Sequence, residues 1–174
     1  TEVVIHWTGL DYQRSAYYLR RGVSINWLIP LQPDSAQPPL ELVDPRNAAW
    51  HAGPLNKGLW EDDAHTICQD GACAPNGNVH SLGFENEGSD VPNAYQIGVM
   101  TDIVAGLIRE GYPIHLDRQH IVGHRDLNSH KPDPGNLDLD KFIALVRQKL
   151  QGASPAVQPV PTPSSASMLP ADGS

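Results

Sequence analysis

The amino-acid sequence predicts an α/β fold, with a central mixed β-sheet flanked by about three helices in a single domain. Short β-branched runs and amphipathic helical segments alternate along residues 1–150, which is typical of an α/β sandwich. A length of 174 residues suits one domain with a sizeable core and leaves little room for two. The composition, 40% apolar and 18% charged, is that of an ordinary soluble folded protein, so we expect a packed core.

The first part of the chain contains four predicted strands and one predicted helix. β-Branched or alternating runs predict strands at residues 3–6, 24–29, 40–43 and 81–85. The helix runs from Asp11, a suitable N-cap, to Arg21, because Gly22 would end it. Successive side chains of a strand point to opposite faces, so Gly83 and Glu85 should share one face, away from Leu82 and Phe84.

The later part of the chain contains two predicted helices with a strand between them. Apolar residues at three- and four-residue spacing predict a helix over 94–110, which Gly111 and Pro113 end. The run from His120 to His124 predicts a strand that ends in histidine. A last helix begins near Asp138 and buries one apolar stripe.

Residues 151–174 differ in composition from the rest of the chain. They are rich in Pro, Ser and Ala and almost free of bulky apolar residues, so we expect a linker or tail rather than a folded segment. We therefore place the folded domain at residues 1–150. Because the chain begins at Thr1 rather than Met, we also expect a trimmed or mature fragment whose targeting signal is not visible.

The charge balance excludes some classes of protein. A net charge of −8 and a pI near 5.3 argue against a nucleic-acid-binding protein, which would carry a basic face. No apolar run approaches the roughly 20 residues that a helix needs to cross a bilayer, so no transmembrane segment is expected.

The only two cysteines, Cys68 and Cys73, lie in a segment that we interpret as a loop. Two thiolates cannot complete a four-ligand zinc site on their own. We interpret the pair as a short local disulfide, with two free thiols as the alternative. A disulfide would indicate an oxidising compartment.

Four polar residues are the candidates for chemistry: His6, His124, Lys131 and Asp133. His6 and His124 each close a β-branched run, where a side chain can project from the edge of a sheet. The polar segment 123–135 is interrupted by two prolines and is interpreted as a rigid loop that can hold His124, Lys131 and Asp133 close together. A histidine and a carboxylate are metal ligands, and a lysine can stabilise an oxyanion. Hydrogen-bonded histidines at strand ends and an ordinary solvated loop are the alternatives.

Five segments, in this order, resemble the amidase_2 family of N-acetylmuramoyl-L-alanine amidases, which is related to peptidoglycan recognition proteins and to amidases of the T7 lysozyme type. They are VVIHWT at 3–8, VSINWLI at 23–29, NAAWHAG at 47–53, NVHSLGFENEG at 78–88 and the GHRD…KPDPG segment at 123–135. The resemblance covers nearly all of residues 1–150 and implies a fold of the same kind as in these relatives.

The resemblance implies a catalytic centre with one zinc ion. The ligands would be His6, His124 and Asp133, leaving a fourth position open for water or substrate. Glu85 would be the acid–base residue and Lys131 the cation at the oxyanion. Glu87, on the same strand face as Glu85, is the alternative base. Without Glu85, the absence of the tyrosine that T7-type enzymes carry at the position of Ile25 would argue against catalysis.

Four residues are predicted to bind substrate because they lie in segments that line the groove of the family. They are Asn26, where many relatives have histidine, Trp50, His51 and Asn78. The partners implied are peptidoglycan or muropeptides, and we expect a monomer, with a further cell-wall-binding module beyond the linker.

Two alternative functions remain beside the one that the resemblance implies, and the location and the substrate are considered with them. One rival is a recognition domain that binds peptidoglycan without cutting it, and the other is a purely structural zinc. We expect a location outside the cytoplasm (extracellular, periplasmic or cell-wall associated), with a phage endolysin as an alternative. The sequence does not distinguish intact wall from 1,6-anhydro fragments as the substrate.

Overall fold

The computed structural model describes residues 1–34, 36–57, 59–60, 66–69 and 72–152, with the backbone alone at 66–69 and 72–74. The predicted tail beyond Gly152, and with it the division into two segments, lies outside these residues. Within the described residues, no helix combines the length and the apolar character needed to cross a membrane.

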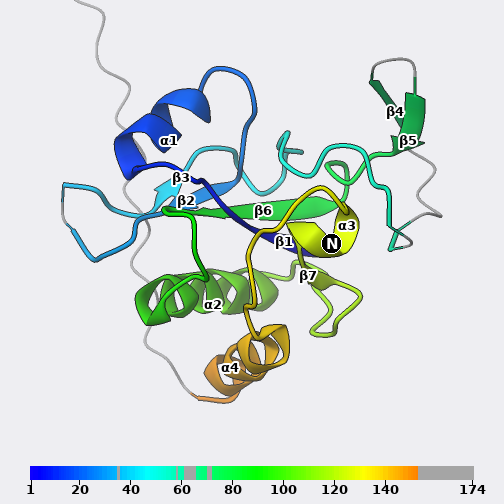
Figure 1. Ribbon diagram of the computed structural model, residues 1–174. Helices are drawn as coiled ribbons and strands as arrows, with labels where there is room; N and C mark the ends of the chain where they lie inside the picture. Colours follow the sequence, from blue (N-terminus) through cyan, green and yellow to red (C-terminus); the bar gives the residue numbers. More distant parts are fainter. Residues whose placement is uncertain (35, 58, 61–65, 70–71, 153–174) are drawn as a thin grey trace, which may run out of the picture.

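A five-stranded mixed sheet forms the centre of the molecule, in the order β3-β2-β6-β1-β7 (Figure 1). The strands are β1 (Glu2–Trp7), β2 (Trp27–Ile29), β3 (Leu40–Glu41), β6 (Ser81–Asn86) and β7 (Ile121–Gly123). Strand β1 pairs in parallel with both β6 and β7, and β2 pairs in parallel with β6. Only β3 runs antiparallel, beside β2. The carboxyl ends of β1, β2, β6 and β7 therefore meet at one edge of the sheet.

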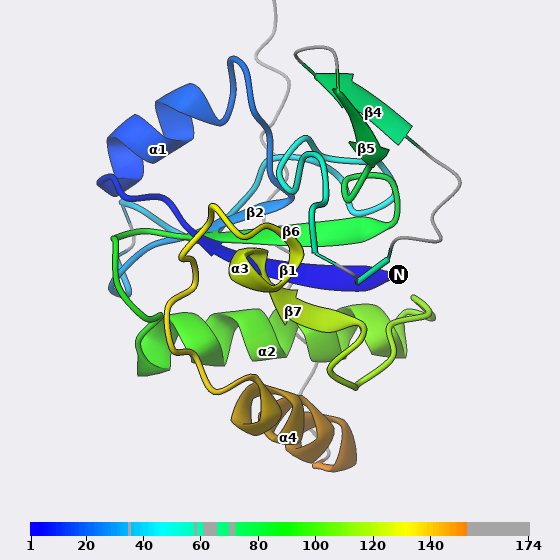
Figure 2. The same cartoon turned by 45° about the vertical axis from the view of Figure 1, so that its right-hand side comes forward.

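Helices cover the two faces of the sheet unequally. Helix α2 (Ala94–Arg109) lies along one face, and α4 (Leu139–Gln151) packs against α2 (Figure 2). Helix α1 (Tyr12–Tyr18) lies on the other side, where it packs against Leu28 of β2. The mixed sheet and three longer helices confirm the predicted fold class.

Local signals in the sequence account for most of these elements. Asp11 caps α1, as predicted, by accepting a hydrogen bond from Arg14 N, and Asp138, near which the last helix was predicted to begin, caps α4 by accepting one from Lys141 N. Asn93 caps α2 in a reciprocal arrangement with Gln96. Strand β2 is shorter than predicted and begins only at Trp27.

Two predictions about irregular segments were wrong. The segment 123–135 is not loop throughout, because it begins with a one-turn helix, α3 (His124–Leu127). Its start is stabilised by a hydrogen bond from Gly123 N to the Asp126 carboxylate at 2.9 Å. The segment with the cysteines forms a hairpin of β4 (Thr66–Gln69) and β5 (Ala72–Pro75), not a loop. The hairpin pairs the backbones of Cys68 and Cys73, but their side chains lie outside the described part, so the disulfide stays a prediction.

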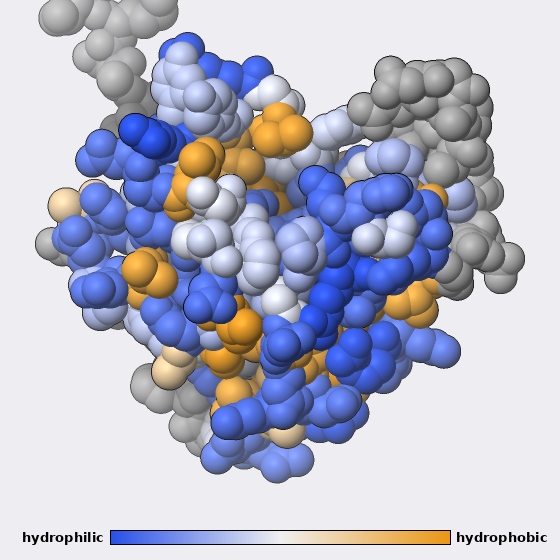
Figure 3. Space-filling view, viewed as in Figure 1, coloured by the Kyte–Doolittle hydropathy of each residue, from blue (hydrophilic) through white to orange (hydrophobic). Residues whose placement is uncertain are grey.

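Hydrophilic side chains dominate the surface over α3 and the loop that follows it (Figure 3). Helix α3 directly follows the carboxyl end of β7, which pairs in parallel with β1. The apolar core lies instead between the sheet and the helices α2 and α4. The candidate site therefore lies at the polar edge of the sheet. Helices α2 and α4 lie below the sheet in the view of Figure 1.

Candidate metal centre

His6 and His124 come together because their strands are parallel neighbours. His6 is the fifth residue of β1, and His124 directly follows β7. Val3 to Ile5 of β1 pair with residues 121–123 of β7, so the next residue of each segment, His6 and His124, lies at the same level. The two Nδ1 atoms lie 2.9 Å apart although 118 positions separate the residues in the sequence.

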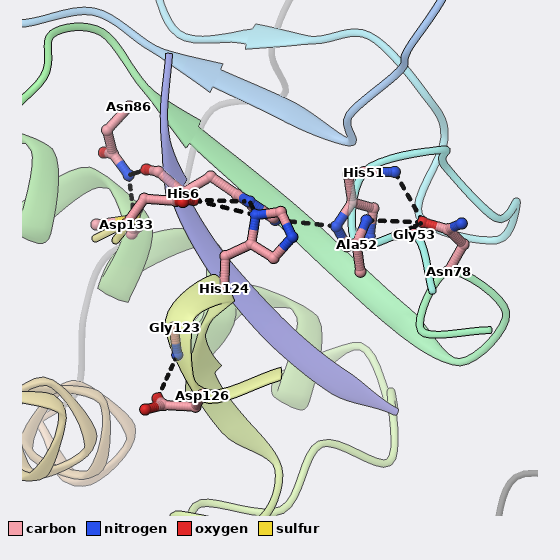
Figure 4. A network of polar contacts seen from close by, with 11 residues as sticks. His6, His51, Ala52, Gly53, Asn78, Asn86, Gly123, His124, Asp126 and Asp133 are labelled. Carbon is pink, nitrogen blue, oxygen red and sulfur yellow. Dashed lines mark hydrogen bonds and ion pairs between the residues drawn. The ribbon is translucent and has the colours of Figure 1, made fainter. Parts of the chain in front are cut away.

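Asp133 reaches the same point because the chain after α3 folds back onto β7. Arg125 N donates to Asp133 O at 2.8 Å and holds the backbone there. Gly123 permits this close approach, since a Cβ at this position would lie 2.4 Å from Pro134 Cδ. The carboxylate Oδ2 of Asp133 lies 3.2 Å from Nδ1 of His6 and 3.2 Å from Nδ1 of His124 (Figure 4). The structure thus brings the three predicted ligands together.

The three ligand atoms fit a divalent metal ion such as zinc. All three side chains are buried, and their ligand atoms lie within 4.8 Å of one another. Tetrahedral zinc with bonds of about 2.0–2.1 Å places neighbouring ligand atoms about 3.3 Å apart. The observed separations of 2.9–3.2 Å are close to that value. Two imidazoles and one carboxylate also form the donor set of catalytic zinc sites, which leave one position open.

The charge states of these residues suit metal binding at neutral pH. Burial lowers the pKa of His6 to about 4, although the contact with Asp133 opposes this shift, so the ring is neutral and can offer a lone pair. Burial would raise the pKa of Asp133, but the imidazoles of His124 and His6 outweigh burial and hold it below its ordinary value. The site therefore presents a carboxylate and a neutral imidazole without first having to lose protons.

Glu85 lies beside these ligands. It is the register partner of His6 on the adjacent parallel strand, and such partners point to the same face of a sheet. Burial raises the pKa of Glu85 to about 8, the negative charge of Asp133 adds to the shift, and Lys131 opposes it. Lys131 is exposed, and its charge acts on both His6 and Glu85. A carboxyl group whose pKa lies near neutrality can both accept and donate a proton.

The alternative base, Glu87, has another task. Its Oε1 accepts a hydrogen bond from Tyr12 N at 3.0 Å, and its Oε2 accepts one from Leu31 N at 2.7 Å. Both carboxylate oxygens thus hold the start of α1 and the end of β2 in place. Glu87 therefore has a structural role, and Glu85 is the carboxylate available to the site.

The Amidase_2 family model, described as N-acetylmuramoyl-L-alanine amidase, matches residues 1–136 of the chain. The chain belongs to this amidase family. The match includes the three clustered side chains and Glu85, and it confirms the resemblance that the sequence motifs indicated. None of the curated proteins compared with the chain matches it.

Solved structures of similar fold agree with this assignment. AmpDh3 of Pseudomonas aeruginosa, in complex with an anhydromuramic pentapeptide, is 25% identical, with a TM-score of 0.61. That match covers 83% of this chain and 58% of AmpDh3. AmiD of E. coli, in complex with a substrate, is 24% identical with a TM-score of 0.61 over 84% of this chain and 57% of its own. AmpD of Citrobacter freundii is 21% identical with a TM-score of 0.51, over 89% of this chain and 85% of its own. The chain therefore spans a little over half the length of AmpDh3 and of AmiD.

Two of the four residues predicted to bind substrate are buried inside the fold. Asn26 is 0% exposed, and its amide accepts from Gly83 N and donates to Val43 O. Asn78 is 2% exposed and is likewise occupied by protein partners. Both side-chain amides are hydrogen-bonded within the protein, and contact of Asn26 and Asn78 with substrate stays a prediction. Trp50, 52% exposed, keeps a large face available.

The fourth residue, His51, is half-buried and contacts the ring of His6 at the metal centre. Its Nδ1 lies 3.0 Å from Nε2 of His6. Burial lowers the pKa of His51 well below its ordinary value, and the neighbouring His6 adds to the shift, so this ring is neutral as well. Two residues that position His51 were not among the predicted site residues. They are Ser81 and Gly83. The only signal for Gly83 was its position on the same face as Glu85.

Proposed function

We propose that the chain hydrolyses the amide bond between the lactyl group of N-acetylmuramic acid and the L-alanine of the peptidoglycan stem peptide, with one zinc ion at the centre formed by His6, His124 and Asp133. The observation that carries the proposal is the convergence of these three buried ligand atoms beside Glu85, in a chain that belongs to the amidase family.

The chemistry assigns a separate role to each residue around the scissile bond. Zinc, when bound, supplies Lewis-acid chemistry that polarises the amide carbonyl and acidifies water. Glu85 accepts the proton of the attacking water and then donates it to the nitrogen of the leaving amine. Lys131 places a positive charge near the oxyanion that develops on the carbonyl oxygen.

The pKa of Glu85 supports the acid–base role. Without a cation, burial raises the pKa of Glu85 to about 8. A divalent ion held by the three ligands would lower this pKa towards about 7, because a nearby positive charge favours the carboxylate. A group with such a pKa has populations of both protonation states at neutral pH. Glu85 can therefore serve both proton transfers in one cycle.

The first substrate to test is an anhydromuramic peptide, because AmpDh3 of Pseudomonas aeruginosa was solved with an anhydromuramic pentapeptide. The metal-stripped chain, with and without added zinc, is incubated with defined anhydro and reduced muropeptides, and mass spectrometry identifies the products. We expect free stem peptide beginning with L-alanine only when zinc is present. Binding without cleavage would instead support a recognition domain, and cleavage that persists in a chelator would contradict zinc catalysis.

A further inference from the structure

We propose that His51 is a positioning residue for the metal centre: its Nδ1 accepts a hydrogen bond from His6 Nε2 and thereby keeps the lone pair of His6 Nδ1 aimed at the metal. The inference rests on the proposed zinc site and adds a residue outside the ligand set. It starts from the 3.0 Å contact between the two rings, which are perpendicular to each other at 88°.

The direction of this hydrogen bond follows from what lies on the far side of His51. Its Nε2 is 3.2 Å from Ser81 Oγ and 3.4 Å from Ser81 O. The hydroxyl of Ser81 donates its own hydrogen to Gly77 O, so both oxygens near Nε2 act as acceptors. Nε2 of His51 must therefore carry the hydrogen. In a neutral imidazole the other nitrogen, Nδ1, is then an acceptor, and His6 Nε2 is the donor.

The position of the His51 ring is held by two neighbouring features. Asn78 Oδ1 accepts hydrogen bonds from the backbone N–H groups of His51, Ala52 and Gly53, at 2.8, 2.7 and 3.2 Å (Figure 4). Gly83 leaves room for the ring, because a Cβ there would lie 2.7 Å from His51 Cγ and 2.8 Å from its Nδ1. The ring thus lies against β6, two residues before Glu85.

Fixing this tautomer matters because Asp133 favours the opposite one. The carboxylate Oδ2 of Asp133, 3.2 Å from His6 Nδ1, would attract a hydrogen on that nitrogen in the metal-free protein. A hydrogen on Nδ1 would occupy the lone pair that the metal needs. The acceptor on His51 keeps the hydrogen on Nε2 instead, as outer partners of metal-bound histidines commonly do. Loss of such a partner typically lowers metal affinity by about 10- to 100-fold.

Nitrogen-15 NMR of the imidazole rings in the metal-free chain tests the hydrogen-bond direction without any activity. We expect the Nε2–H tautomer for both His6 and His51 in the unmodified protein. In His51→Leu, which removes the acceptor, His6 should shift towards the Nδ1–H tautomer beside Asp133. A His6 ring that is Nδ1–H in the unmodified protein would overturn the inference, and so would a tautomer that His51→Leu leaves unchanged.

Zinc competition against a chromophoric chelator tests the consequence. His51→Leu should bind zinc about 10- to 100-fold more weakly. His51→Asn keeps an acceptor oxygen close to the position of Nδ1 and should recover most of the loss. His115→Asn, at an exposed histidine away from the site, is the matched control and should bind like the unmodified chain. Gly83→Ala, whose Cβ would lie 2.2 Å from Ile25 Cδ1 and 2.7 Å from His51 Cγ, should displace the His51 ring and weaken zinc binding as His51→Leu does.

The outcomes separate this inference from the proposed function. An unmodified chain that binds no zinc contradicts the zinc site itself. If the unmodified chain binds zinc, and His51→Leu and His51→Asn bind zinc with equal affinity, the zinc site stands. The positioning role of His51 is then overturned.

Discussion

The two faces of strands β1 and β6 carry different residues, although the strands lie side by side. Towards α2, Val3 and Ile5 of β1 and Leu82 and Phe84 of β6 form a continuous apolar surface inside the core. On the opposite face, alternate positions of the same strands carry His6, Gly83 and Glu85.

The difference teaches that one pair of strands supplies both stability and chemistry. The apolar face favours folding through burial of hydrocarbon surface. The other face removes a carboxyl group and two imidazoles from water, which shifts the pKa values of Glu85, His6 and His51 and costs stability. We therefore expect substitutions on the two faces to affect different properties.

The largest effect should follow from Glu85→Gln, on the polar face. Glutamine keeps the size of the side chain but cannot transfer a proton, so the turnover rate should fall by roughly 10²- to 10⁴-fold. Zinc content, from elemental analysis, should stay at one ion per chain. Near-normal turnover on a defined muropeptide would contradict the role of Glu85.

Phe84→Ala tests the apolar face at the neighbouring position. Phe84 is 0% exposed and stacks on Trp27 with ring centroids 4.8 Å apart. Its truncation should lower the free energy of unfolding by about 3–5 kcal/mol. Denaturant unfolding measures this loss. The turnover per folded molecule should stay close to normal, and a loss of turnover as large as that in Glu85→Gln would show that the two faces are not separable.

The cost of burying Glu85 should appear in the pH dependence of stability. The folded-state pKa of about 8 lies above the ordinary value of 4.5, so the contribution of Glu85 is fully favourable below pH 4.5 and is lost as the pH rises towards 8. The metal-free Glu85→Gln variant should therefore be more stable than the unmodified chain at pH 8, by about 2–4 kcal/mol. Thermal unfolding at pH 5 and pH 8 should show most of the difference at the higher value, and an equal difference at both would contradict a raised pKa.

The smallest effect is expected for Glu87→Gln, two residues after Glu85 and just beyond the end of β6. One oxygen can still accept a hydrogen bond, while the charge and the second acceptor are lost, so unfolding should become easier by about 1 kcal/mol. Turnover should hardly change. A rate loss similar to that of Glu85→Gln would mean that the acid–base role belongs to Glu87.

Local patterns in the sequence were sufficient for the sheet and its long helices. Alternation at 81–85 correctly assigned Phe84 to the core and Glu85 to the other face. The N-caps Asp11 and Asp138 marked the starts of α1 and α4. The hairpin β4–β5 and the one-turn helix α3 were missed because polar, proline- and glycine-containing segments do not show a clear period.

The site depended more on resemblance than on pattern. Residues 6, 124 and 133 have no spacing that links them, and their approach requires parallel pairing of β1 with β7 and the tight packing at Gly123. Asn26 and Asn78 were placed in the groove because their motifs lie there. In the structure their side chains hydrogen-bond to Gly83 N and to the N–H groups of residues 51–53, which are contacts across the fold that no local rule predicts.

The central claim is that His6, His124 and Asp133 share one divalent ion. The most direct test is the zinc content of the unmodified chain and of Asp133→Ala after reconstitution and removal of loosely bound metal. We predict one zinc per chain in the unmodified protein and a large loss in the variant. An unmodified chain without zinc, or equal zinc in both proteins, would contradict the account.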